Sequence, residues 1–337
     1  GVKTIALYMG TTAAAIVLGM FFATLLQPGV GIDLSSTTPA ALSDAKTLSE
    51  RLLGIIPSNP AEALAKGDVL AIIFFSILLG IGIMMAGDKG RPLAKLFDSG
   101  SDAILNVTHL VMEVAPFGVF ALIAFVTGTK GIGALVDVIW LVLAVLLASI
   151  AQILIVYCGI IKLGLKLSPL TFIRGALDAQ MVAFSTSSSN ATLPVTMTVA
   201  EENLGIKKQV ASSVLPLGAT INMDGTALYV GILAIFSAQI FGVSLDLADY
   251  LLIALTTTLV SIGTAGVPSA SLFLLAAVLS AIGIGPAETA FVVGFVLPFD
   301  RPLDMTRTLL NVTSDLTVAT AVAKWEGNLD EDVFNAD

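Results

Sequence analysis

The chain has 337 residues, of which 56% are hydrophobic and only 12% are charged, and its formal net charge is −9. A soluble domain carries about 25% charged residues, and the mean hydropathy here is +0.96. This composition excludes a disordered tail, a coiled coil and an ordinary soluble enzyme. The acidic balance without a Lys/Arg cluster argues against a nucleic-acid partner. One cysteine, Cys158, and one histidine, His109, exclude disulfide frameworks and multi-residue Cys/His metal sites.

Five long stretches carry no charged residue, and about 20 apolar residues suffice to cross a bilayer. They are residues 4–32, 138–161, 179–200, 225–245 and 250–287. The sequence therefore predicts an all-α, multi-pass membrane protein, with crossings at 4–26, 65–87, 103–127, 137–161, 207–238 and 289–324. With Gly1 inside, ten basic residues fall inside, four outside and two within the membrane, which agrees with the positive-inside rule.

Two further apolar segments, 169–203 and 248–287, return the chain to the side that it left. Each is interrupted by small and hydroxylated residues, STSSSNATLP at 185–194 and SIGTAGVPSAS at 261–271. Non-helical backbone at membrane depth is tolerated only where it is buried in protein or lines a cavity. We therefore expect two re-entrant helical hairpins with tips near the midplane. Each is followed by a crossing with a polar centre, which is the inverted-repeat plan of secondary transporters.

Polar residues interrupt the last two crossings. In the last one, residues 300, 304, 307, 308, 311 and 315 share one helical stripe, which must face protein or water. The preceding motif NMDGT (222–226) can unwind and offer oxygen ligands to a hard cation. The alternatives are structural ion pairs in the stripe, although buried pairs seldom contribute net stability, and a simple glycine kink at Gly225.

Four motifs, in this order and spacing, resemble those of the sodium-coupled dicarboxylic amino-acid transporter family. They are STSSSNATLP, GATINMDGT (218–226), SIGTAGVP (261–268) and DMTRTLLNVTSD (304–315). The resemblance covers essentially the whole chain and implies the glutamate-transporter fold, in an inner cell membrane. It also implies a homotrimer in which a transport part moves as an elevator against a scaffold. Family members begin with two further spans, and Gly1 matches the start of the third, so we expect this chain to lack the first two.

The resemblance divides the chain into seven regions. They are a first transport-part span (1–26), an extracellular loop (27–64), scaffold and trimerisation spans (65–132), another transport-part span (133–168), the first hairpin with its broken crossing (169–238), the second hairpin with the last crossing (248–326) and a cytoplasmic tail (327–337).

The resemblance also implies a site for an acidic amino acid. Asp304 would pair with the substrate ammonium, and Arg307 would grip the side-chain carboxylate through its planar donors. The other expected substrate-binding residues are Ser187, Ser188, Thr226, Gly266, Val267, Thr308 and Asn311.

Relatives carry a further arginine near the pocket where this chain has Thr186 or Met305. Arg301 is therefore expected to supply that charge and to pair with Asp304 when the site is empty. Alternatively, Arg301 reaches water at the outer end of the span.

Sodium is the co-transported ion that the resemblance implies, at three sites. The first would use the carbonyls of Gly218 and Asn222 with Asn311 and Asp315. The second would use the carbonyls of Thr220, Ser261, Ile262 and Thr264, and the third would use Tyr8, Thr11, Thr12, Asn222 and Asp224. Val230 replaces the glutamate that animal relatives link to proton coupling, so proton and potassium coupling are not assumed.

Rival readings remain open. A C4-dicarboxylate has no ammonium and would make Asp304 a liability, while a neutral amino-acid carrier belongs to the same superfamily. An ion channel is the rival from another class, because its pore can use the same polar stripe. A membrane-embedded enzyme lacks support, since no nucleophile and base pair is visible. The sequence does not choose between aspartate and glutamate.

Overall fold

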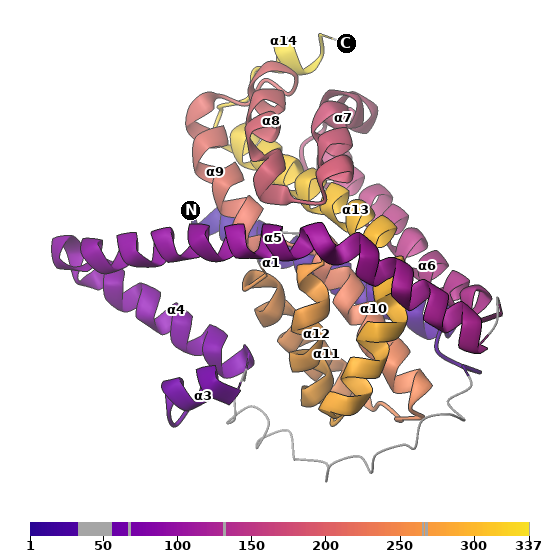
Figure 1. The fold of residues 1–337 in the computed structure, drawn as a ribbon. Helices are drawn as coiled ribbons and strands as arrows, with labels where there is room; N and C mark the ends of the chain where they lie inside the picture. Colours follow the sequence, from indigo (N-terminus) through magenta and orange to yellow (C-terminus); the bar gives the residue numbers. More distant parts are fainter. Residues whose placement is uncertain (33–55, 67–68, 131–132, 265, 267–268, 337) are drawn as a thin grey trace.

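The computed structural model describes residues 1–32, 56–66, 69–130, 133–264, 266 and 269–336. Apart from an isolated antiparallel bridge between Ile206 and Leu329, the regular structure in these ranges is helical (Figure 1). The elements are α1 (Val2–Leu26), α3 (Pro60–Lys66), α4 (Val69–Met85), η1 (Gly87–Gly90), α5 (Arg91–Lys130), α6 (Gly133–Ala151), η2 (Gln152–Tyr157), η3 (Ile160–Gly164), α7 (Pro169–Thr186), α8 (Ser189–Glu202), α9 (Lys208–Ile221), α10 (Asp224–Ile240), α11 (Leu247–Ile262), α12 (Ala270–Ala281), α13 (Pro286–Trp325) and α14 (Glu331–Phe334).

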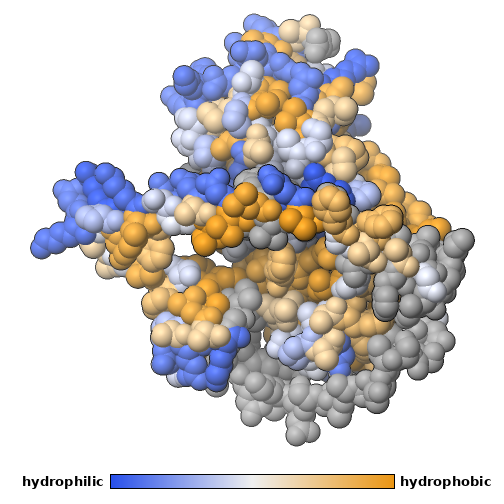
Figure 2. Space-filling model, viewed as in Figure 1, coloured by the Kyte–Doolittle hydropathy of each residue, from blue (hydrophilic) through white to orange (hydrophobic). Residues whose placement is uncertain are grey.

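Three helical stretches of the described chain are long and apolar enough to cross a membrane. They are Val2–Leu26, Val138–Gly164 and Lys208–Ile240. The other expected crossings lie in α4, which has 17 residues, and in α5 and α13, which carry charged residues along their length. Figure 2 shows apolar residues over the middle of the visible face. Hydrophilic residues gather at the top, at the far left and at the lower left of the view. Exposed apolar surface of this extent suits contact with lipid.

The centre of the fold is α10, which is buried without interruption from Asp224 to Ala238. One apolar cluster surrounds it with residues of α1, α6, α11, α12 and the first half of α13. A second cluster joins α7, α8 and α9 to the second half of α13. Because α13 belongs to both clusters, its polar stripe lies where the two halves of the core meet.

Each of the two predicted hairpins is a pair of packed helices, α7 with α8 and α11 with α12. The first breaks at Ser187, in the left-handed region with φ 54°, and at Ser188, whose hydroxyl caps α8 by accepting from Ala191 N at 3.2 Å. Asp246 and Asp249 form a capping box at the start of α11. Figure 1 shows the two hairpins on opposite sides of α13. That their tips lie at the middle of a membrane stays a prediction.

The crossing at 207–238 is broken, as NMDGT predicts. Helix α9 ends at Ile221 and α10 begins at Asp224, with Asn222 between them in a non-helical conformation. Gly225 does more than allow a kink, because a Cβ there would collide with the backbone of Arg307 on α13. The sequence thus lets α10 approach α13 closely at the polar stripe.

Helices α4 and α5 lie at the periphery (Figure 1). Helix α5 runs for 40 residues through the expected loop between crossings, and its described side chains expose large apolar groups such as Phe117. Part of the expected loop at 27–64, residues 33–55, lies outside the described residues, and α3 occupies its end.

The C-terminal segment packs on the turn between α8 and α9. Lys207 N donates to Asn328 O at 3.0 Å, and Asp330 N donates to Gly205 O at 2.8 Å. Phe334 of α14 is 1% exposed and belongs to the cluster around α7. The tail is therefore an integral part of the packed fold.

Candidate functional site

A pocket lies between the tips of the two hairpins, the start of α10 and the middle of α13. The pocket is small, and part of it is open to solvent. The lining residues are Ser187, Ser189, Met223, Thr226, Thr264, Gly266, Ala270, Ser271, Asp304, Thr308 and Asn311. A pocket of this size and polarity suits a small polar ligand.

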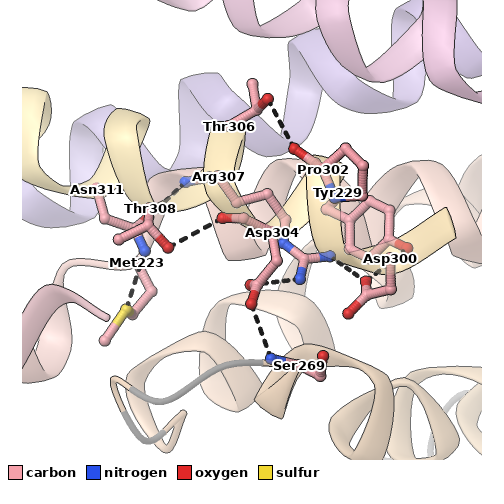
Figure 3. A network of polar contacts seen from close by, with 11 residues as sticks. Met223, Tyr229, Ser269, Asp300, Pro302, Asp304, Thr306, Arg307, Thr308 and Asn311 are labelled. Carbon is pink, nitrogen blue, oxygen red and sulfur yellow. Dashed lines mark hydrogen bonds and ion pairs between the residues drawn. The ribbon is translucent and has the colours of Figure 1, made fainter. Parts of the chain in front are cut away.

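Arg307 of α13 holds two carboxylates of its own helix (Figure 3). Its Nη1 lies 2.9 Å from Asp300 Oδ1, and its Nη2 lies 2.5 Å from Asp304 Oδ1. Tyr229 of α10 donates its hydroxyl to Asp300 at 3.1 Å, and the guanidinium carbon lies 4.0 Å from the Tyr229 ring centre. Arg307 is 1% exposed. One desolvated cation therefore faces two carboxylates, which leaves the group with excess negative charge.

Among the described residues that line the pocket, Asp304 is the one with a charged side chain. Its Oδ2 accepts from the backbone N–H of Ser269, at the start of α12, at 2.9 Å (Figure 3). Arg307 does not line the pocket, because its terminal nitrogens are bonded to the two carboxylates. In this state the pocket attracts a cationic group to Asp304 and presents no guanidinium to an anion.

Asp224, fully buried at the start of α10, collects donors from three other elements. Its carboxylate accepts from Thr12 at 2.7 Å, from Ser314 at 2.8 Å and from Tyr157 at 2.9 Å, with longer contacts from Thr11 and Gln152 at 3.4 Å. These neutral oxygens around one carboxylate suit a singly charged hard cation.

Asp315, one turn beyond Asn311 on α13, is another buried carboxylate near the pocket. Its Oδ1 accepts from Asn222 Nδ2 at 2.8 Å, and a Cβ at Gly218 would collide with that same oxygen. Asn311 accepts from Gly225 N at 2.8 Å. The structure thus brings the residues of the first expected sodium set to one place, beside the broken crossing.

Of the other two expected sodium sets, the third is only partly assembled. Thr11 and Thr12 contact Asp224, but Tyr8 donates to Val214 O at 2.9 Å instead. Ser261, Ile262 and Thr264 follow one another at the end of α11. The side chain of Thr220 is exposed and bonds within α9 to Leu217 O at 2.8 Å. In the described residues no group of three or more His, Cys, Asp and Glu side chains could hold a metal.

Six of the ten expected substrate residues line the pocket. They are Ser187, Thr226, Gly266, Asp304, Thr308 and Asn311. Ser188 lies beside it and donates from Oγ to Gly266 O at 2.5 Å, which joins the two hairpin tips. Arg307 lies behind the wall, and Val267 lies outside the described residues.

The expected pairing of Arg301 with Asp304 in an empty site is not found. Asp304 is bonded to Arg307 and to Ser269 N, while Arg301 is exposed and has no ion pair within the described ranges. Arg307, and not Arg301, is the cation bonded to both buried carboxylates, Asp300 and Asp304.

The structure places several further residues in contact with the expected site residues. Tyr157 and Gln152 contact Asp224 from η2, and Tyr229 contacts Asp300. The available signal was polarity, because Gln152 is the amide within the charge-free stretch 138–161. Ser314 directly precedes Asp315 of the predicted stripe. In the sequence it cannot be distinguished from a serine that only packs between helices.

Comparison with known proteins identifies relatives along the whole chain. The sequence matches the model of the "Sodium:dicarboxylate symporter family" over residues 1–325. It is 37% identical to the "Proton/sodium-glutamate symport protein" of Bacillus subtilis, with 97% of this chain and 77% of the relative covered. It is 38% identical to the "Proton/glutamate-aspartate symporter" of Escherichia coli, with 98% and 77% covered.

A third relative carries a different substrate name. The "C4-dicarboxylate transport protein" of Azorhizobium caulinodans is 32% identical, with 99% of this chain and 76% of the relative covered. The family match and these identities agree with the exposed apolar helices and with the polar pocket between the hairpin tips. The chain belongs to the sodium:dicarboxylate symporter family and is a multi-pass membrane transporter rather than an enzyme.

Proposed function

We propose that the protein couples inward sodium movement to the uptake of an acidic amino acid, aspartate or glutamate. The observation that carries this proposal is the pair Asp304 and Arg307, one turn apart on α13 and linked at 2.5 Å. An acidic amino acid has an ammonium for the carboxylate and a distal carboxylate for the guanidinium. Among the described residues at the pocket, this pair is the arrangement of charge that matches both groups.

Binding on this proposal is an exchange of ion-pair partners. The substrate ammonium replaces Arg307 Nη2 on Asp304, and the freed side of the guanidinium turns to the distal carboxylate. Asp300 keeps its contact to Nη1, at 2.9 Å, and holds the guanidinium near the pocket. The exchange gives the ammonium, the distal carboxylate and the guanidinium each a partner, which matters because an unpaired buried charge costs several kcal/mol.

Sodium coupling follows from charge and from connectivity. The acidic substrate adds negative charge to a region that already holds Asp224 and Asp315, so its binding favours cations there. Asn311 links the two functions, since it lines the pocket and also accepts from Gly225 N beside Asp224. A cation that orders this junction prepares the pocket for substrate, and linkage makes the effect reciprocal. Relatives named as sodium-glutamate symport proteins support the same proposal.

Elevator movement and a homotrimer belong to the same proposal. The peripheral position of α4 and α5, and the exposed apolar side chains of α5, support their role as the scaffold and trimer interface. The helices that line the pocket share two continuous clusters through α13. They can therefore move as one body past α4 and α5.

A C4-dicarboxylate carrier is the second candidate, because such relatives also match. Thermal stabilisation of the purified protein by aspartate, glutamate, succinate and serine, with and without sodium, distinguishes the two. A ligand at 100 times its Kd adds roughly 2.7 kcal/mol to stability. We expect aspartate or glutamate to stabilise in sodium only, and succinate and serine to have little effect. Stabilisation by succinate without an effect of the amino acids would overturn the proposed substrate.

A further inference from the structure

The second hairpin places an unassigned hydroxyl in the pocket wall. Ser271, in the first turn of α12, is 2% exposed and lines the pocket, and its Oγ has no hydrogen-bond partner in the described part of the chain. Ser187, from the tip of the first hairpin, has the same three properties. A buried hydroxyl without a partner costs about 1–3 kcal/mol. Two such groups in one pocket indicate donors that await a ligand.

The other polar side chains of the pocket are largely committed. Thr308 donates to Asp304 O at 2.9 Å, and Thr264 donates to Val260 O at 3.1 Å. Asn311 uses its amide oxygen for Gly225 N and its amide nitrogen for the sulfur of Met223, at 3.2 Å. Ser271, like Ser187, therefore keeps a free hydroxyl beside donors of Thr308, Thr264 and Asn311 that are already engaged.

The position of Ser271 on its helix determines what it can bind. It lies in the first turn of α12, which has 12 residues, and the backbone N–H of Ser269 just before it already donates to a carboxylate, that of Asp304. The start of a helix favours negative charge because its first N–H groups are unpaired and its dipole is positive there. A hydroxyl at this point adds one more donor to an anion-binding helix end.

We infer that Ser271 Oγ donates a hydrogen bond to a carboxylate oxygen of the substrate, and that it is a specificity-determining residue of the second hairpin. The inference rests on the proposed function, since it takes the ligand to be an acidic amino acid. The ammonium of that ligand goes to Asp304, so a carboxylate is the group left for Ser271.

Ser271→Ala tests this inference with two readouts of opposite sign. The affinity for aspartate and glutamate at saturating sodium should fall roughly tenfold, because a hydrogen bond to a charged group is lost. The melting temperature of the unliganded variant should stay equal or rise, because an unsatisfied buried hydroxyl has been removed. If Ser271 has a purely structural role, the affinity for aspartate and glutamate should not change.

Ser149→Ala is the matched control. Ser149 lies on α6, is buried, and also lacks a partner in the described residues, but it does not line the pocket. We expect Ser149→Ala to have the same effect as Ser271→Ala on the melting temperature of the unliganded protein. Its affinity for aspartate and glutamate should equal that of the wild type. If Ser271→Ala does not fold, Ser271→Cys keeps the volume with a weaker donor, and its affinity should also fall.

Asparagine, which lacks the distal carboxylate, tells which carboxylate Ser271 contacts. A loss for aspartate alone assigns the distal one, and an equal loss for asparagine assigns the α-carboxylate. Wild-type affinity of Ser271→Ala for aspartate and glutamate would overturn the inference. If the wild-type protein itself does not bind an acidic amino acid, the proposed function fails instead.

Discussion

Arg307→Cys is the substitution that should change the charge selectivity of the transporter. Arg307 is the buried cation beside the pocket and is bonded to both Asp300 and Asp304. Its removal takes away the group proposed for the distal carboxylate of the substrate. The single variant also leaves two buried carboxylates facing one another without a cation.

The loss of substrate affinity must be measured separately from the loss of folding stability. Removing one partner of a buried ion pair destabilises a protein by about 3–5 kcal/mol, so we expect Arg307→Cys alone to unfold before it can be titrated with substrate. The double variant Asp300→Asn, Arg307→Cys removes one of the orphaned charges and should recover part of that loss. A lost charge-assisted contact of about 1.5–3 kcal/mol lowers affinity by roughly 10- to 150-fold. We expect this loss for aspartate and glutamate in the double variant as well.

The assay is substrate-dependent stabilisation of the purified double variant at saturating sodium, with aspartate, glutamate, serine and alanine. Acidic substrates should lose their effect, while serine or alanine keeps an ammonium for Asp304 and can now bind. Arg301→Ala is the control, because it also removes a cation from α13. Arg301 is exposed and has no ion pair in the described residues. The affinity of Arg301→Ala for aspartate and glutamate should match that of the wild type. A tenfold loss would instead support the role in substrate binding that the sequence analysis expected for Arg301. Unchanged acidic affinity in the double variant would refute the assignment of Arg307.

Three further outcomes follow from the packing. Asp224→Asn should weaken the sodium dependence of substrate binding more than substrate affinity at saturating sodium, because Asp224 lies in a ring of neutral donors outside the pocket; a titration of sodium against substrate affinity measures it. Gly225→Ala should abolish binding and lower the melting temperature, since its Cβ would collide with the Arg307 backbone; wild-type uptake would contradict that contact. Phe334→Ala should destabilise the protein by about 3–5 kcal/mol without changing substrate affinity, because Phe334 is 1% exposed in a cluster away from the pocket; calorimetry and a binding isotherm check both parts.

Local sequence signals were sufficient for the helices and for the places where they break. Hydroxyl-rich and polar runs predicted interruptions, and the structure breaks the chain at Ser187 and at Asn222. The same signals did not predict that α5 is continuous from Arg91, because a polar helix end and a polar loop have similar composition.

The partners within the site depended on tertiary structure. Helical spacing predicted a polar stripe on α13, but it did not say which cation pairs with which carboxylate. Arg301 and Arg307 lie about 120° apart around a helix, and only packing against Tyr229 of α10 decides that Arg307 is the buried one. The contacts of Gln152 and Tyr157 with Asp224 likewise join residues about 70 positions apart, at separations of 72 and 67.

Uptake of labelled aspartate or glutamate into proteoliposomes containing the purified protein tests the central claim most directly. An inward sodium gradient is imposed while an ionophore collapses the proton gradient. The account predicts accumulation above the outside concentration, and none when sodium is equal on both sides. Accumulation driven by a proton gradient alone, or only downhill movement of the amino acid, would contradict sodium-coupled symport.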